Sequence, residues 1–315
     1  MNNEEKYIAR LMFKNKIFQK DGQAYEDFFV KVLKHHNPNF LPVKAHGQFG
    51  DRKNDGFDKT TGTYYQVYAP EDLEKRKKRA VEKFKEDFDD LYKYWNDKVT
   101  PVKEFFYVLN NKYRAVPQII YPVLEEIKRK YSSVQVNILL NQDLEEIFLK
   151  LPDDKIYDII GYIPDPLTIQ VVDFKAMNQV IEYLLSIESP YIKEAIPEKP
   201  DFEKKIVFNK LSARPANLLR TGDYQASNLD EYFKYESQLK EILKKIFNNI
   251  YKRGLEVVPN GDDKNDTVFF YILENASSDK KKPVQDAVLV LMSYYFEYCD
   301  IFEEPKEPAQ RSLFE

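Results

Sequence analysis

The residues best suited to chemistry lie in one stretch of the chain, HGQFGDRKNDGFDKTTGTYYQVYAPED, from His46 to Asp72. Turn residues separate two β-prone runs there, which predicts a hairpin that turns at Thr61–Gly62. We expect Asp55 near the end of the first strand and Gln66 on the second strand. A carboxylate and a carboxamide held side by side on paired strands offer the oxygen ligands that a hard divalent cation prefers.

Alternation along the second predicted strand sorts its side chains onto two faces. Tyr64, Gln66 and Tyr68 share one face, and Tyr65 and Val67 share the other. The alternative for the whole stretch is a solvated loop whose Asp, Asn and Gly residues only form turns.

The order of the motif residues resembles the core of a known nuclease family. Gly50-Asp51, Asp55-Gly56 and Gln66-Val67 are similar to the glycine-rich run, Asp-Gly pair and Gln-x-Lys motif of restriction-endonuclease-like (PD-(D/E)XK) nucleases, particularly the Mrr type. The resemblance implies DNA cleavage with Mg²⁺ or Mn²⁺ and makes Asp55 the metal-binding aspartate. It implies Gln66 and the Val67 carbonyl as further ligands, and Asp51 as a loop-stabilising acid.

The resemblance also assigns a role to the first predicted helix, which begins at Gly22. The family carries a Phe/Tyr-Glu pair there that directs an acid at the metal, and Tyr25-Glu26 matches that pair. Glu26 is therefore an implied metal ligand, and its alternative is an ordinary exposed glutamate in a first helical turn. His46, which precedes the central loop, is a further candidate.

One departure from the family bears on activity, because Tyr68 stands where the family has its lysine. A neutral phenol cannot supply the positive charge that stabilises the attacked phosphate. Lys53 lies two residues before Asp55 and would share its strand face if the strand is regular. Two functions thus stay open: a metal-dependent DNA endonuclease with Lys53 in the catalytic set, or a catalytically degenerate DNA-binding or scaffold subunit.

The chain carries a formal net charge of −4, which argues against a protein that binds nucleic acid over its whole surface. Any contact with DNA must therefore use a local basic patch. Lys75, Arg76, Lys77, Lys78 and Arg79 follow the hairpin directly, and Arg52 lies inside the motif. We expect these side chains to contact phosphates, with a plain solvated helix face as the alternative.

The order of elements predicts an α/β domain with a mixed sheet flanked by helices. The hairpin is followed by a helix at about 71–96, a buried strand at Val102–Leu109, a helix at about 117–131, a second buried strand at Val134–Leu140 and a helix at about 143–151. This is the order that the nuclease resemblance requires. We divide the chain into a restriction-endonuclease-like domain at 1–160, a connecting segment at 161–203 and a mainly α-helical C-terminal domain at 204–315.

The C-terminal part is expected to be helical throughout. Asn228 with Glu231 predicts the start of a helix that ends before Gly254, and Pro283 predicts the start of the last helix. That last helix is apolar on almost every side, which predicts a protein–protein interface or, alternatively, a buried core helix.

A second resemblance lies in this C-terminal part. The runs Tyr295–Glu303 and Lys205–Leu211 are similar to the C-terminal domain of effectors of ABC-three-component bacterial defence systems. This implies an antiphage effector whose partners are an SMC-like ABC ATPase and a small middle-component subunit. A homo-oligomer is also compatible with the sequence.

The remaining composition indicates the cellular setting. A single cysteine excludes a disulfide framework and suits a reducing compartment. The first residues lack the basic and apolar regions of a signal peptide, and no apolar run has the length of a membrane span. We therefore expect a cytoplasmic protein without a membrane segment.

Overall fold

The computed structural model describes residues 1–44, 52–165, 173–188, 201–234, 236–298 and 301–305. His46 and Asp51, two residues of the predicted site, lie outside these ranges, as do residues 166–172 and 189–200 of the expected connecting segment. Contacts divide the chain into two compact units, which we call the sheet unit (Met1 and Lys16–Ile160) and the helical unit (Asn2–Asn15 and Gly161–Glu315).

The sheet unit is built around a five-stranded mixed sheet in the order β1-β2-β3-β4-β5. Strand β2 pairs antiparallel with both β1 and β3, whereas β3, β4 and β5 run parallel to one another. Its strands are β1 (Phe40–Pro42), β2 (Gly56–Asp58), β3 (Thr63–Tyr68), β4 (Glu104–Leu109) and β5 (Gln135–Leu139). The predicted hairpin is β2–β3 and the two predicted buried strands are β4 and β5, so the mixed sheet is confirmed.

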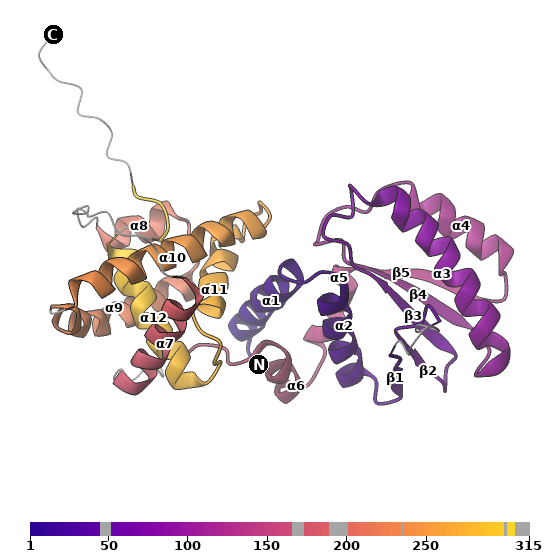
Figure 1. Cartoon of the computed structure of the whole chain (residues 1–315), viewed down its shortest axis with the longest axis horizontal. Coiled ribbons are helices and arrows are strands. Elements are labelled where there is room, and N and C mark those ends of the chain that lie inside the picture. Colours follow the sequence, from indigo (N-terminus) through magenta and orange to yellow (C-terminus); the bar gives the residue numbers. More distant parts are fainter. Residues whose placement is uncertain (45–51, 166–172, 189–200, 235, 299–300, 306–315) are drawn as a thin grey trace, which may run out of the picture. The chain divides into compact units, whose positions relative to one another are not determined.

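Helices cover both faces of this sheet (Figure 1). Helices α3 (Lys77–Lys98) and α4 (Ile120–Lys130) lie on one face, and α2 (Gly22–His36) and α5 (Asn141–Leu149) lie on the other, with α6 (Asp153–Ile160) next to α2. Because α3 begins at Lys77, the residues from Glu71 to Arg76 form a loop, and the predicted start of this helix is wrong.

The alternation expected for β3 decides which helices each side chain meets. Tyr64 stacks on Phe57 and packs against Trp95 of α3, with ring centroids 5.3 and 5.9 Å away. Tyr65 lies on the opposite face, 5.7 Å from both Phe29 and Phe40. Each face of β3 is thus held by aromatic contacts, and a register slip would exchange the two sets.

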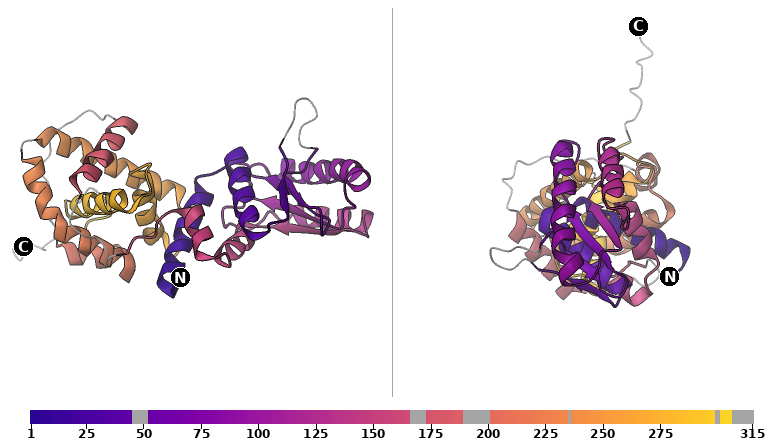
Figure 2. Two further views of the ribbon diagram at one scale, coloured as in Figure 1. Left: turned by 90° about the horizontal axis from the view of Figure 1, so that it is seen from below. Right: turned by 90° about the vertical axis from the view of Figure 1, so that its right-hand side faces the viewer.

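The helical unit contains α7 (Phe174–Ile187), α8 (Phe202–Phe208), α9 (Ala213–Phe233), α10 (Ser237–Val257), α11 (Lys264–Asn275) and α12 (Lys282–Glu297). Helix α12, drawn in yellow in Figure 2, lies in the centre of this unit and is buried from Val284 to Phe296, mainly against α9 and α7. The predicted interface role of α12 is therefore wrong, and the alternative of a buried core helix is correct.

Two predicted helix boundaries in this unit are also wrong. Asn228 lies inside α9, and Gly254 lies inside α10. Gly254 is suited to a helix interior here because a Cβ at this position would meet Tyr271 at 3.0 Å and Val268 at 3.2 Å. The glycine permits close packing of α10 on α11, so it does not end the helix.

The first residues of the chain complete the helical unit. In the N-terminal helix α1 (Asn3–Phe18), the Tyr7 hydroxyl donates to Asp266 at 2.9 Å, and the Lys14 ammonium lies 2.7 Å from Asp263. The Asn15 amide donates to the Thr267 carbonyl at 3.1 Å. These contacts all meet the first turns of α11. Across the ranges that the structure describes, no helix has both the length and the apolarity needed to cross a bilayer.

The glycine of the Asp-Gly pair predicts a measurable stability effect. Phe40 is fully buried, and a Cβ on Gly56 would fall 2.1 Å from the tip of its ring. We expect Gly56→Ala to lower the free energy of unfolding of the sheet unit by about 1–3 kcal/mol through overpacking, measured by chemical denaturation. Gly261→Ala is the control, since its nearest neighbour would lie at 3.5 Å. Equal stabilities would show that the Phe40 ring moves aside freely.

Candidate metal centre

Asp55 lies immediately before β2 and is fixed by backbone hydrogen bonds on both sides. Its N–H donates to the Tyr65 carbonyl at 2.9 Å, and its carbonyl accepts from the Val43 N–H at 3.1 Å. The Asn54 side chain accepts from the Gly56 N–H at 3.1 Å and closes a tight turn around Asp55. The carboxylate thus lies at the start of the hairpin, directly before β2. The predicted position near the end of the first strand is wrong.

Three of the predicted ligand groups meet at this carboxylate. Asp55 Oδ2 accepts from the Val67 N–H at 2.5 Å and from Gln66 Nε2 at 2.9 Å, and the same Nε2 lies 3.4 Å from the Val67 carbonyl. Asp55 is 1% exposed and Gln66 is 7% exposed. The Gln66 carboxamide is thus within hydrogen-bond distance of both the buried Asp55 carboxylate and the Val67 carbonyl.

The polar atoms at this point fit a divalent cation. Gln66 Oε1 is buried and has no hydrogen-bond donor among the residues described. The amide nitrogen now donates toward two oxygens, Asp55 Oδ2 and the Val67 carbonyl, and the two ends of an amide exchange by rotation about its terminal bond. With Oε1 turned inward, all three groups would present oxygen, the ligand atom that Mg²⁺ and Mn²⁺ prefer.

The described residues contain no cluster of three or more His, Cys, Asp or Glu side chains able to hold a metal. The centre therefore depends on amide and carbonyl oxygens beside Asp55. Glu26, the other predicted carboxylate ligand, is half-buried on α2 and accepts a hydrogen bond from Gln23 at 2.9 Å. Its neighbour Tyr25 points into the core and donates to Asn141 at 2.5 Å.

The structure separates Lys53 from the strand on which it was expected. Strand β2 begins at Gly56, and Lys53 has a φ of 61°, so the assumption of a regular strand through Lys53 and Asp55 is wrong. The Lys53 ammonium lies 3.0 Å from Oδ1 of Asp87, a fully buried acid on α3. The sequence reasoning missed Asp87, although its spacing from Phe84 and Leu91 places it within the apolar stripe of α3.

Tyr68, the last residue of β3, carries a neutral ring. It stacks on Tyr107 with centroids 6.1 Å apart and planes 11° apart. Burial raises the pKa of Tyr68, while Arg76 and Arg79 act in the opposite direction and Asp87 adds to the increase. The phenol therefore stays protonated at neutral pH and supplies no charge of its own.

The basic residues after the hairpin are partly neutralised by nearby acids. Lys75 lies 3.6 Å from Asp72, Lys77 pairs with Glu74, and Arg79 lies within 3.5 Å of Glu82 and Glu86. Within the described part of the chain, Arg76 and Lys78 have no such acid partner. Arg52 faces a different way, because its guanidinium lies over the Tyr94 ring, 5.2 Å from the centroid.

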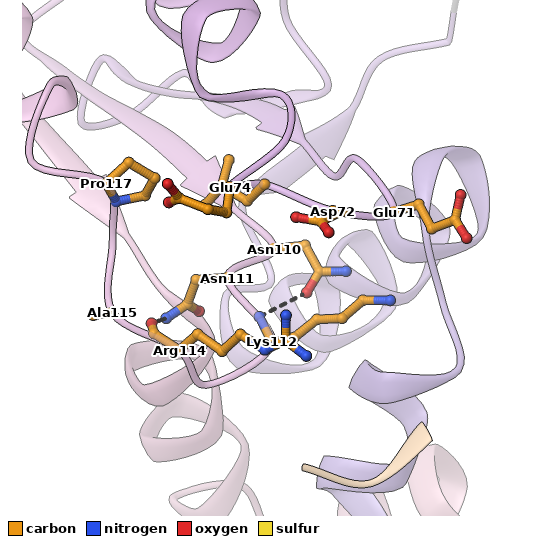
Figure 3. A pocket seen from close by; sticks show the side chains of 10 residues that line it. Glu71, Asp72, Glu74, Asn110, Asn111, Lys112, Arg114, Ala115 and Pro117 are labelled. Atoms are coloured by element: carbon orange, nitrogen blue, oxygen red, sulfur yellow. Dashed lines mark hydrogen bonds between the residues drawn. The ribbon is translucent and has the colours of Figure 1, made fainter. Parts of the chain in front are cut away.

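A pocket is lined by residues that follow the carboxyl ends of β3 and β4 (Figure 3). Glu71, Asp72 and Glu74 line one wall, and Asn110, Asn111, Lys112 and Arg114 line the other. The two asparagine amides are engaged in hydrogen bonds with Lys20, Asn141, Gln142 and the chain around Arg114. They brace the ends of the strands, and the pocket places an acidic loop opposite a basic one.

Comparison with known proteins identifies a domain in the helical unit. Residues 175–303 match the family model of C-terminal domain 10 of the ABC-three component (ABC-3C) systems. The expected C-terminal domain of ABC-3C type is thus supported. No curated protein and no solved structure matches the chain. Helix α1 adds to the ABC-3C domain a helix from outside the matched residues.

The unpaired Gln66 oxygen leads to a prediction about charge. Gln66→Glu would place a second carboxylate beside Asp55, and their repulsion would raise the folded-state pKa of the pair above its unfolded value. Without divalent ions, the variant should keep its stability below about pH 4 and lose it as the pH rises through the raised pKa. Thermal unfolding in EDTA at several pH values measures this loss.

Addition of Mn²⁺ at neutral pH should restore the stability of Gln66→Glu, because a ligand that binds only the folded state stabilises it. Gln66→Met is the matched control, since it keeps the side-chain volume but offers neither charge nor a hard oxygen ligand. A Mn²⁺ effect on Gln66→Glu no larger than that on Gln66→Met would contradict a cation site at Gln66.

Proposed function

We propose that this chain is a metal-dependent DNA endonuclease that acts as the effector of an ABC-3C antiphage defence system. The observation that carries the proposal is the meeting of the Asp55 carboxylate, the Gln66 amide and the Val67 carbonyl at one buried point of a mixed sheet. The order of helices and strands around that point is the order that restriction-endonuclease-like nucleases require.

Asp55, Gln66 and the Val67 carbonyl would hold one Mg²⁺ or Mn²⁺, with Glu26 contributing directly or through water. When bound, the ion lowers the pKa of a water molecule and offsets charge on the phosphate under attack. The protein's part is to hold its oxygens in place before DNA arrives. The backbone hydrogen bonds of Asp55 to Val43, which follows β1, and to Tyr65 of β3 do this without relying on any long flexible side chain.

Arg76 and Lys78 would contact the DNA backbone from the start of α3. Both lie in the part of the chain that follows β3, and neither is paired with a described acid, in contrast to Lys75 and Lys77. The positive charges of Arg76 and Arg79 act to lower the pKa of the Tyr68 hydroxyl. These arginines would thus bring positive charge to the position where the family has its lysine.

A second candidate function is a DNA-binding or scaffold subunit without catalytic activity. It is favoured by what the structure shows for Tyr68 and Lys53, the two residues considered for the positive charge that cleavage requires. Tyr68 is a stacked neutral phenol, and the Lys53 ammonium is bound to Asp87. In this alternative the divalent ion would stabilise the sheet unit and the basic residues would still contact DNA.

The partners would be an SMC-like ABC ATPase and a small middle-component subunit, which contact the helical unit. Since α12 is buried, the contact must use other residues. Val207 and Phe208 of α8 are 75% and 50% exposed, and Tyr224 of α9 is 83% exposed. These apolar side chains provide the kind of surface that partner subunits cover.

Plasmid cleavage by the chain together with its partners tests the nuclease directly. We expect nicking with Mg²⁺ or Mn²⁺, none in EDTA, and a loss of about 100-fold or more in Asp55→Asn. Asp90→Asn, which changes an exposed acid on α3, is the control and should cleave normally. Normal cleavage by Asp55→Asn would refute the site. Absence of cleavage by the wild type under every divalent ion tested would favour the scaffold subunit.

DNA binding gives an independent prediction, because it does not require cleavage. The double variant Arg76→Gln/Lys78→Gln should weaken DNA binding and flatten its dependence on salt concentration, because fewer counterions are released. Lys75→Gln/Lys77→Gln removes the same charge from residues that are already paired and should have the smaller effect. Fluorescence anisotropy across a salt series measures both. Equal effects of the two pairs would show that the acid partners do not matter.

A further inference from the structure

Helix α3 carries a buried acid that faces the segment leading to Asp55. Asp87 is fully buried, and its two oxygens face ammonium groups, with Lys53 3.0 Å from Oδ1 and Lys83 3.4 Å from Oδ2. Removing one partner of a buried ion pair leaves the other charge without compensation, which is strongly unfavourable. Asp87 thus holds the Lys53 ammonium against α3.

The backbone at this point needs such support. Arg52 and Lys53 have φ values of 55° and 61°, a left-handed conformation that is unfavourable for residues other than glycine. The Arg52 carbonyl accepts a hydrogen bond from the indole N–H of Trp95 at 3.2 Å, and its guanidinium lies over Tyr94. Together with the Lys53–Asp87 pair, these contacts attach both left-handed residues to one helix.

Lys53, which these contacts attach to α3, lies two residues before Asp55 of the candidate centre. Asn54 is fully buried and continues the turn that ends in the Gly56 N–H hydrogen bond. A chain held at Lys53 and again at Gly56 leaves Asp55 little freedom. If the left-handed residues relaxed toward ordinary φ values, the Asp55 carboxylate would move relative to Gln66 and Val67.

We propose that Asp87 is a positioning residue of the metal centre. By holding Lys53 against α3, it keeps Arg52 and Lys53 in their left-handed conformation and so sets the place of Asp55. The inference rests on the proposed metal centre but not on cleavage. It also assigns Lys53 a task other than catalysis, because its ammonium serves the buried acid.

The test uses the full-length chain and its single tryptophan. Trp95 donates to Arg52, so its emission reports whether the segment stays attached to α3. In Asp87→Asn we expect red-shifted Trp95 emission, stronger quenching by iodide, and Mn²⁺ affinity about tenfold or more lower in calorimetry. Asp90→Asn, on the same helix, should behave as the wild type in all of these measurements.

Two variants of Lys53 distinguish positioning of Asp55 from a general effect on stability. They also provide a test if Asp87→Asn does not fold. Lys53→Met removes the ion pair, and methionine, unlike glycine, disfavours a φ of 61°, so the segment should relax and Mn²⁺ binding should weaken. Lys53→Gly also removes the pair, but glycine adopts a φ of 61° freely. Its Mn²⁺ affinity should therefore stay closer to that of the wild type.

The outcomes are distinct. Asp87→Asn or Lys53→Met with wild-type Trp95 emission and Mn²⁺ affinity, whatever their thermal stability, would overturn the inference and make Asp87 a core ion pair only. Equal losses of Mn²⁺ affinity in Lys53→Met and Lys53→Gly would overturn the role of the left-handed backbone. No Mn²⁺ binding by the wild type would refute the proposed centre itself.

Discussion

A carboxylate removed from water must find hydrogen-bond donors, and the sheet unit is arranged around this requirement at Asp55. The donors are the Val67 N–H and the Gln66 amide, which come from β3. They reach Asp55 only if β2 and β3 pair in the observed register, with Gly56 opposite Tyr65. The hairpin, the aromatic packing on both faces of β3 and the close approach of Phe40 all maintain that register.

Helix α3 links the hairpin to the rest of the sheet unit. Phe84 stacks on Tyr107 of β4 with centroids 4.3 Å apart, and Trp95 packs on Tyr64 of β3. The same helix holds a buried charge, Asp87, between these apolar contacts. A helix that packs on two strands and also binds the loop ahead of a third resists small shifts of any one of them, because packed interiors do not deform continuously.

The pattern of the sequence was sufficient where local rules decide the structure. Alternation placed Tyr64 and Tyr65 on opposite faces of β3, and the motif brought Asp55 and Gln66 together. It was insufficient for Lys53, because a left-handed lysine is supported by tertiary contacts that no local pattern contains. Asp87 was missed for a related reason: a charged residue in an apolar stripe is predicted to face solvent unless its partners are known.

The membership of α1 in the helical unit determines the order in which the two units can fold. Its apolar residues, among them Ile8, Leu11 and Phe13, are buried, and its polar contacts are with α11. Residues 2–15 are synthesised before the sheet unit, and α11 follows some 250 residues later, after the entire sheet unit. The sheet unit can thus fold before α11 is made, whereas the ABC-3C domain closes on α1 only after α11 has been made. A nascent chain that has not yet reached α11 would carry an unfinished domain, with α1 exposed to chaperones.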